Sequence, residues 1–219
     1  MVALQGTLLG ADEPAVDPTR RAERAVLDPT SWIDVRRGFL RGADTLLEHL
    51  VDAITWRRGR RWMYERVVDE PRLSWSGKAD QPVPHDVIDD YRHALTDDYG
   101  VPFGGPFLNY YRDGRDSVAW HGDTEMRHVE DTRVAILTLG AARPFLLRPR
   151  GGGRSRDLRP GSGDLIVMGG ASQRDWEHAV PKTAHAGPRI SVSVRWTSGR
   201  GPAISSSGGP AGPRDHVTA

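Results

Sequence analysis

Two stretches of the chain place apolar residues three and four positions apart, which is the spacing of an amphipathic helix. The first covers residues 43–54, and its apolar stripe consists of Leu46, Leu47, Leu50, Val51 and Ile54. The second covers residues 85–99 and stops before Gly100, and its apolar face consists of Val87, Ile88, Tyr91 and Leu95. We predict two helices that each pack one face on another part of the molecule.

Beyond Gly100 the apolar period changes to two, which is typical of β-strands. Short runs rich in β-branched and aromatic residues are separated by Gly, Pro and Asp. These runs are PFLNYYR, VAWHGD, RVAILTLG, PFLLR, DLIVMG and RISVSVRWT. Helices first and many short strands afterwards predict an α+β fold, with a sandwich or barrel backed by the helices.

The two ends of the chain lack this patterning. Residues 1–30 are polar and interrupted by proline, with room for a short helix over residues 20–27, and we predict an N-terminal extension outside the core. Residues 199–219 contain five Gly, three Pro and three Ser, and have too few apolar groups to offset the entropy of ordering, so they predict a disordered tail. One domain over residues 31–198 remains.

Composition excludes several classes of protein. The 30 basic and 29 acidic residues leave a net charge of +1, so the chain is neither a polyanion-binding tail nor an acidic disordered protein. The absence of cysteine excludes a disulfide scaffold, a thiolate zinc site, an iron–sulfur cluster and a cysteine nucleophile. Only Lys78 and Lys182 are lysines, so clusters of arginine are weaker evidence for nucleic-acid binding than usual.

Nothing in the sequence indicates a membrane partner. No uninterrupted apolar stretch approaches the roughly eighteen residues of a membrane span. The first residues lack the basic region and the long apolar segment of a signal peptide. We therefore expect a cytoplasmic protein, and a monomer because no second apolar surface is evident.

With cysteine absent, a metal site has to use His and carboxylate side chains. His121 and Asp123 in AWHGDTE are two apart on a predicted strand, so both side chains lie on one face. Such a pair alone has an ordinary explanation as a solvated strand end, and for His178 alone a loop histidine is the favoured explanation. Together they offer two imidazoles and one carboxylate, the set with which non-haem Fe(II) oxygenases hold their metal and leave other positions open.

The last predicted strand carries a second, independent feature. In RISVSVRW the apolar residues alternate with Arg189, Ser191, Ser193 and Arg195. Both guanidinium groups therefore point to the face opposite the apolar one. An edge strand with its polar side in water has the same pattern, but beside a metal an inward arginine is a fork for a carboxylate.

These residues resemble the motifs of a known family. The segments NYYRDGRDSVAWHGDTE, GDLIVMGGASQRDWEHAVPK and PRISVSVR resemble the AlkB-type branch of the Fe(II)/2-oxoglutarate dioxygenases. The resemblance covers about residues 32–196 and rests on four motifs in order, namely Asn-x-Tyr, His-x-Asp-x-Glu, a distal His and Arg-x5-Arg. It implies a double-stranded β-helix, or jelly-roll, core backed by the N-terminal helices.

The resemblance also implies roles for individual residues. Fe(II) would be held by His121, Asp123 and His178. The cosubstrate 2-oxoglutarate would be held by Arg189 at its far carboxylate and by Asn109 and Tyr111, with Arg195 near the metal-bound end and near Asp123. Family members commonly carry Asn two residues after the first Arg, whereas this chain has Ser191, so one hydrogen bond to the cosubstrate is shortened or lost.

The activity implied is oxidative demethylation of N-alkylated bases, such as 1-methyladenine and 3-methylcytosine, in DNA or RNA. Dioxygen is consumed, 2-oxoglutarate is decarboxylated to succinate, and the methyl group leaves as formaldehyde. In the family this chemistry serves the repair of DNA alkylation.

A base must leave its stack before a deep metal can reach it. Residues 57–80 resemble the nucleotide-recognition lid of the family, where Trp75 or Tyr64 would stack on the base and Arg72 would face the substrate. Glu125 would accept a hydrogen bond from an exocyclic amine. The ordinary alternatives are that Trp75 is a structural residue and that Arg72 and Glu125 are simply exposed to solvent. Phosphate contacts are expected from residues 57–61 and 148–160.

Two other functions stay open at this stage. The same iron chemistry can act on a small molecule or a protein side chain, since the loops rather than the metal set decide the substrate. A jelly-roll binding module without turnover would belong to another class, although the complete set of ligands and both arginines argue against it.

Overall fold

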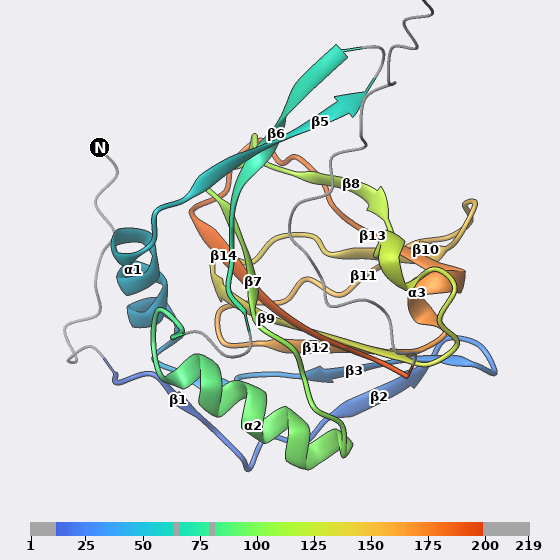
Figure 1. Cartoon of the computed structure of the whole chain (residues 1–219), viewed down its shortest axis with the longest axis horizontal. Coiled ribbons are helices and arrows are strands. Elements are labelled where there is room, and N and C mark those ends of the chain that lie inside the picture. Colours follow the sequence, from blue (N-terminus) through green and yellow to red (C-terminus); the bar gives the residue numbers. More distant parts are fainter. Residues whose placement is uncertain (1–11, 64–65, 79–81, 199–219) are drawn as a thin grey trace, which may run out of the picture.

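Two antiparallel sheets face one another in the computed structural model, which describes residues 12–63, 66–78 and 82–198 (Figure 1). The larger described sheet has eight strands, in the spatial order β2 (Glu23–Val26), β3 (Ser31–Arg36), β12 (Leu165–Gly170), β9 (Thr132–Gly140), β14 (Arg189–Thr197), β7 (Phe107–Tyr111), β6 (Arg66–Ser76) and β5 (Arg57–Met63). The smaller described sheet has four, in the order β11 (Arg156–Asp157), β10 (Leu146–Pro149), β13 (Trp176–Val180) and β8 (Val118–His121). A short pairing joins β1 (Ala15–Val16) to β4 (Leu40–Arg41). The predicted α+β fold with a jelly-roll core is confirmed.

Both predicted helices are present. The first is α1 (Ala43–Ala53), and the second is α2 (Val87–Tyr99). Gly100 ends α2 in the left-handed region, with φ at 66°, and its N–H donates to the Thr96 carbonyl oxygen at 2.9 Å. The short helix α3 (Ser172–Asp175) and the 3₁₀ turn η1 (Thr124–Met126) complete the described helices. Within the described ranges, no helix has the length and apolar character needed to cross a membrane.

The main apolar core lies between these helices and the larger sheet. Helix α1 contributes Leu46, Leu47 and Leu50, and α2 contributes Val87, Ile88, Tyr91 and Leu95. The sheet contributes Leu108, Ala135, Leu137, Leu139, Leu165, Val167, Ile190, Val192 and Val194. The helices therefore cover one face of the larger sheet, and only its other face is left to meet the smaller sheet (Figure 1).

A second apolar cluster lies between the two sheets. The larger sheet contributes Ile33, Tyr111, Val134, Ile136, Ile166 and Met168, and the smaller sheet contributes Leu147, Trp176 and Val180. Met126 and Phe145 from connecting segments pack in the same cluster. This cluster holds the sheets apart at a fixed spacing, so side chains at its margin face one another across a defined gap.

The short helix expected around residues 20–27 is wrong, because residues 23–26 form strand β2. This strand pairs with β3, where Arg24 opposes Asp34. Arg24 Nε and Nη2 each donate to an Asp34 carboxylate oxygen at 2.7 Å, and the guanidinium lies 3.8 Å from the centre of a Trp32 ring. Contacts with residues distant from the segment therefore override its local preference.

The domain boundary at residue 31 stays a prediction, and residues 199–219 lie outside the described residues.

The segment predicted as a lid is a β-hairpin that continues the larger sheet. Strand β6 pairs with β5 on one side and with β7 on the other, where Ser74 opposes Asn109 and Trp75 opposes Leu108. Residues opposite one another in an antiparallel pair share a face. The pairing with β7 therefore decides which side chains of β6 can reach the space between the sheets.

Asp28, in the turn between β2 and β3, is expected to make the fold sensitive to acid. Partial burial raises its pKa, but hydrogen bonds from Trp176 Nε1 at 2.5 Å and from Thr30 lower the pKa to about 2. A depressed folded pKa contributes stability that is present above the ordinary pKa and is lost as the pH falls toward 2. Asp28→Asn should lower the melting temperature at pH 7 by several degrees, and this deficit should shrink between pH 4 and pH 2 in calorimetric scans. Asp12→Asn, at an exposed position, is the control, and a deficit independent of pH would contradict the expectation.

Candidate active site

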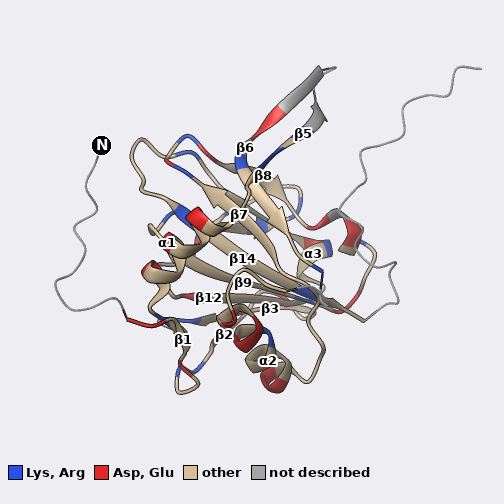
Figure 2. Cartoon of the chain, turned by 60° about the vertical axis from the view of Figure 1, so that its left-hand side comes forward, with Lys and Arg blue, Asp and Glu red and all other residues tan. Residues whose placement is uncertain are grey.

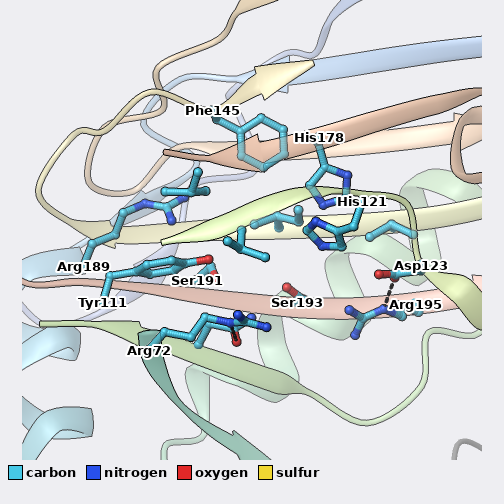
Figure 3. Close-up of a pocket in the computed structure, with 15 residues that line it drawn as sticks. Arg72, Tyr111, His121, Asp123, Phe145, His178, Arg189, Ser191, Ser193 and Arg195 are labelled. Atoms are coloured by element: carbon cyan, nitrogen blue, oxygen red, sulfur yellow. Dashed lines mark hydrogen bonds and ion pairs between the residues drawn. The ribbon is translucent and has the colours of Figure 1, made fainter. Parts of the chain in front are cut away.

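A pocket opens between the two sheets, and most of the residues singled out from the sequence line it (Figure 3). Among the predicted site residues it contains Arg72, Asn109, Tyr111, His121, Asp123, His178, Arg189 and Arg195. The rest of its lining is formed by Ser191, Ser193, Phe145, Val118, Val134, Ile136 and Val180. One cavity therefore collects side chains from β6, β7, β8, β13 and β14.

Strand β14 supplies the polar floor of this pocket. Arg189, Ser191, Ser193 and Arg195 line it, whereas Ile190, Val192 and Val194 belong to the core beneath the helices. The strand pairs on both sides, with β7 and with β9, so it is not an edge strand. The predicted alternation is confirmed, and the polar face points into the molecule rather than into water.

Arg189 lies at one end of the pocket with most of its hydrogen-bonding capacity unused. Its exposed fraction is 1%, and its Nη2 donates to Thr138 Oγ1 at 3.2 Å. Nε and Nη1 are buried and have no hydrogen-bond partner in the described structure. Burial lowers the pKa of Arg189 below its ordinary value, the neighbouring Tyr111 opposes this shift, and Arg143 adds to it. Buried unpaired guanidinium donors are costly, so this environment fits an anion that accepts from both nitrogens, such as a carboxylate.

Tyr111 and Asn109 stand beside Arg189 on the neighbouring strand. Tyr111 opposes Arg189 in the register between β7 and β14, and its ring centre lies 5.3 Å from the guanidinium carbon. Asn109 opposes Ser191, and its Oδ1 accepts a hydrogen bond from Arg72 Nε at 2.7 Å. With this oxygen already bonded, the amide NH₂ of Asn109 is the group left to donate. The pocket therefore offers several donors around one end.

His121 and His178 meet at the other part of the pocket. The two residues oppose one another in the pairing of β8 with β13, and their ring centres are 4.3 Å apart. Nδ1 of His121 lies 2.8 Å from the Ala119 carbonyl oxygen, which can only accept, so Nδ1 carries the proton and Nε2 the lone pair. Burial lowers the pKa of the His121 imidazole. Burial also lowers the pKa of His178, and together with the neighbouring His121 it brings this pKa to about 3. Neutral imidazoles are the form that binds a metal.

Asp123 lines the same pocket but is paired with Arg195. Arg195 Nε donates to Asp123 Oδ2 at 2.5 Å, as the dashed line in Figure 3 marks. Burial raises the pKa of Asp123, and the Arg195 guanidinium lowers it below its ordinary value. In the described part of the chain, no three His, Asp or Glu side chains are grouped closely enough to hold a metal as they stand. The donor set nevertheless fits Fe(II) in chemistry, with two neutral imidazoles and one ionised carboxylate on a single pocket.

Of the predicted substrate contacts within the described residues, one lines the pocket and two do not. Arg72 points into the pocket, whereas Trp75 packs against the core beneath the helices, on the face of β6 shared with Leu108. Trp75 therefore contacts the core and does not line the pocket, and its predicted stacking on a base stays a prediction. Glu125 is exposed on η1 and is not part of the pocket lining, although its charge raises the pKa of Arg195. Tyr64 lies outside the described residues.

The arginine-rich segments are partly engaged in internal contacts. On β5, Arg58 and Arg60 both approach the Asp69 carboxylate, at 3.3 and 3.6 Å. Arg148 pairs with Glu177 at 2.6 Å, and Arg150 donates to backbone carbonyls. Basic and acidic positions are interspersed over the described ribbon in Figure 2. Phosphate contacts from residues 57–61 and 148–160 stay a prediction.

Two buried residues near the site carry no signal that the sequence patterns reveal. Arg143 donates to the backbone carbonyls of Asp113, Asp116 and Pro181 at 2.7 to 3.0 Å, and it lies 5.4 Å from the Tyr111 ring centre. Gln173 on α3 accepts a hydrogen bond from the Asp123 backbone N–H at 3.0 Å. Both follow turns rather than periodic runs, so only their burial identifies them.

The chain matches known proteins over most of its length. Residues 45–196 match the model of the 2OG-Fe(II) oxygenase superfamily. The alpha-ketoglutarate-dependent dioxygenase alkB homolog 3 of Homo sapiens is 30% identical over 210 residues, which cover 84% of this chain and 73% of that protein. The DNA oxidative demethylase ALKBH2 of Arabidopsis thaliana is 31% identical over 146 residues, which cover 56% of this chain and 45% of that protein.

The fold also matches a solved structure. A prolyl hydroxylase from Trichoplax adhaerens, in complex with a hypoxia inducible factor peptide fragment, has a TM-score of 0.61, at 12% identity and over 80% of this chain and 87% of that chain. This likeness shows a common fold. Because the family model covers more than half of the sequence and the alkB homolog most of it, the family is established. The chain belongs to the 2OG-Fe(II) oxygenase superfamily, as a member of its AlkB-type branch, and is a dioxygenase that uses Fe(II) and 2-oxoglutarate.

Proposed function

We propose that this enzyme removes methyl groups oxidatively from N-alkylated bases of DNA or RNA, of the 1-methyladenine and 3-methylcytosine type. The observation that carries the proposal is the pocket with two adjoining neutral imidazoles in one part and, in another, a buried arginine whose Nε and Nη1 have no partner among the described residues. The demethylase name of the relative from Arabidopsis thaliana supports the choice of substrate class.

Within this proposal, His121, His178 and Asp123 hold Fe(II), and Arg189 binds the far carboxylate of 2-oxoglutarate. Asn109 and Tyr111 add hydrogen bonds to the cosubstrate. Arg195 keeps Asp123 ionised, and the carboxylate has to turn from its contact with Arg195 toward the two imidazoles when the metal enters. When bound, the iron and 2-oxoglutarate supply the oxidation by dioxygen that yields succinate, carbon dioxide, formaldehyde and the unmethylated base.

Arg72 is the substrate-side residue that the geometry supports best. Its side chain is 13% exposed, lines the pocket and bonds to Asn109, so it connects the β5–β6 hairpin with the cosubstrate side of the site. Its contact with Glu70 at 3.3 Å holds the guanidinium in place. Glu125, two residues after Asp123 and exposed, remains our candidate acceptor for an exocyclic amine. A cytoplasmic location and a monomeric state belong to the same proposal.

Formaldehyde release tests the proposed reaction. The purified protein with Fe(II), 2-oxoglutarate and ascorbate should release formaldehyde from oligonucleotides that contain 1-methyladenine or 3-methylcytosine, and none from the unmethylated sequence. Activity should fall steeply with added salt, because phosphate contacts release counterions. Succinate formation that leaves every methylated oligonucleotide unchanged would move the substrate to small molecules or proteins. Absence of succinate under all conditions would indicate a binding module.

A further inference from the structure

The short helix α3 lies against the segment that contains His121 and Asp123, and one of its side chains is aimed at that segment. Gln173 has an exposed fraction of 1%, and its Oε1 accepts the Asp123 N–H at 3.0 Å. Within the described part of the chain, its Nε2 makes one weak contact, a donation to Met168 Sδ at 3.8 Å. The amide oxygen is therefore the functional end of this buried side chain, and its partner is the backbone of a proposed iron ligand.

Gly122, between the two proposed ligands, packs so closely on α3 that a side chain would not fit there. A Cβ atom placed on Gly122 would lie 2.6 Å from the Gln173 carbonyl oxygen and 3.2 Å from that of Trp176. Real Cβ atoms essentially never come within 3.0 Å of such an atom. Gly122 therefore allows the segment to sit directly on the backbone of α3 and on the start of β13.

Arg150 closes this contact from the outside. Its Nη2 donates to the Gln173 carbonyl oxygen at 2.8 Å, and its Nε donates to the Arg174 carbonyl oxygen at 2.5 Å. The same Nη2 would be 2.7 Å from a Cβ on Gly122. The guanidinium thus bonds carbonyls at the end of α3 that the helix itself leaves unpaired, and it covers Gly122.

We propose that Gln173, with Arg150 behind it, is a positioning residue that fixes Asp123 relative to His178, an inference that rests on the proposed iron site. Strand β13 begins directly after α3, so the helix that bonds Asp123 is continuous in the chain with the strand that carries His178. One hydrogen bond therefore couples ligands from two segments that are distant in the sequence. It also fixes the Asp123 backbone, so that only the side chain has to turn from Arg195 toward the metal.

Gln173→Met keeps the length of the side chain and removes the acceptor. We expect it to weaken Mn(II) binding, measured by calorimetry as a stable substitute for Fe(II), by 10- to 100-fold, the loss typical of removing an outer-shell partner. In the metal-free protein, the Asp123 amide should exchange with deuterium faster than in the wild type. Gln173→Glu keeps an acceptor at the same place and should restore slow exchange. Arg174→Gln, whose side chain pairs only with Asp175 among the described contacts, is the matched control and should change neither readout.

Arg150→Met is the second variant, because its side chain is exposed and its loss should not prevent folding. Arg150→Met should weaken Mn(II) binding several-fold and speed the deuterium exchange of the Asp123 amide. If Gln173→Met does not fold, these two measurements on Arg150→Met test the positioning role. If the wild type binds Mn(II), His178→Ala does not, and Gln173→Met and Arg150→Met bind like the wild type, the positioning role is wrong and the iron site stands. If the wild type itself fails to bind Mn(II), the iron site fails. Slow exchange at Asp123 in Gln173→Met would also overturn the positioning role.

Discussion

Arg189→Met is expected to raise the KM for 2-oxoglutarate about 100-fold or more. The wild-type guanidinium is buried, and its Nε and Nη1 have no partner among the described residues, so a carboxylate bound there gains charge-assisted hydrogen bonds in a site shielded from water. Removing one partner of such a buried pair costs about 3 kcal/mol or more, and each 1.4 kcal/mol is about tenfold in binding. Succinate formation measured against cosubstrate concentration gives the KM.

The same substitution should have the opposite effect on the protein without cosubstrate. A buried guanidinium that leaves donors unpaired destabilises the fold, and methionine removes this cost while it fills much of the volume. We expect the melting temperature of the metal-free and cosubstrate-free variant to equal or exceed that of the wild type. Added 2-oxoglutarate should raise the melting temperature of the wild type, since a ligand that binds only the native state stabilises it, and should leave the variant unchanged.

Two further variants separate this explanation from a general loss of buried charge. Arg189→Lys keeps the charge but loses the planar guanidinium, so its KM for 2-oxoglutarate should lie between that of the wild type and that of Arg189→Met. Arg133→Met removes a largely buried arginine on β9 that pairs with Asp131 and faces Trp32, away from the pocket, and should leave the KM unchanged. Unaltered cosubstrate affinity in Arg189→Met would remove Arg189 from the site.

His178→Ala is expected to abolish formaldehyde and succinate production. The imidazole lies against His121 in a buried position, and alanine offers no atom that can bind the metal. Loss of a direct ligand should weaken metal binding by more than the 10- to 100-fold that loss of an outer-shell partner costs. The measurement is Mn(II) calorimetry beside the formaldehyde assay. His93→Ala, at an exposed position on α2, is the matched control and should retain activity.

Acid stability provides a readout of His178 that does not depend on the metal. Burial, and secondarily His121, lower the pKa of His178 from its ordinary value to about 3, so the unfolded chain binds a proton below pH 6.5 that the folded protein does not. The wild type without metal should therefore lose stability as the pH falls from 7 toward 4. His178→Ala should lose less over the same range. Parallel curves for the two proteins would contradict the buried, neutral state of this imidazole.

The sequence predicted the elements whose periodicity is local. The stripe of α1, the apolar face of α2 with Gly100 at its end and the alternation along β14 each follow from spacing within one segment. For the same reason the sequence placed His121 with Asp123, and Arg189 with Arg195, on common faces. Side-chain direction along a strand is fixed by parity, so such pairs need no tertiary information.

The local patterns of the sequence did not predict which distant segments pair with one another. Strand β13 is short and mixed in character, so the sequence patterns predict no strand around His178, although this residue opposes His121 in the pairing of β13 with β8. Residues 23–26 became a strand because β3 offers Asp34 and Trp32 as partners for Arg24. For Trp75 the local pattern does indicate a direction: on strand β6 its side chain lies on the same face as that of Leu73 and on the face opposite to that of Arg72. Which parity faces the pocket was decided by the register with β7.

The sequence by itself thus determined the helices, most of the strands and the kinds of side chain that the site contains. The resemblance already implied that Arg195 lies near Asp123. Only the tertiary structure decided that Gln173 bonds the Asp123 backbone, and that Nε and Nη1 of Arg189 have no partner among the described residues. The physical reason is that periodicity fixes the face on which a side chain lies, whereas hydrogen-bond partners and burial depend on segments that meet only after the sheets have formed.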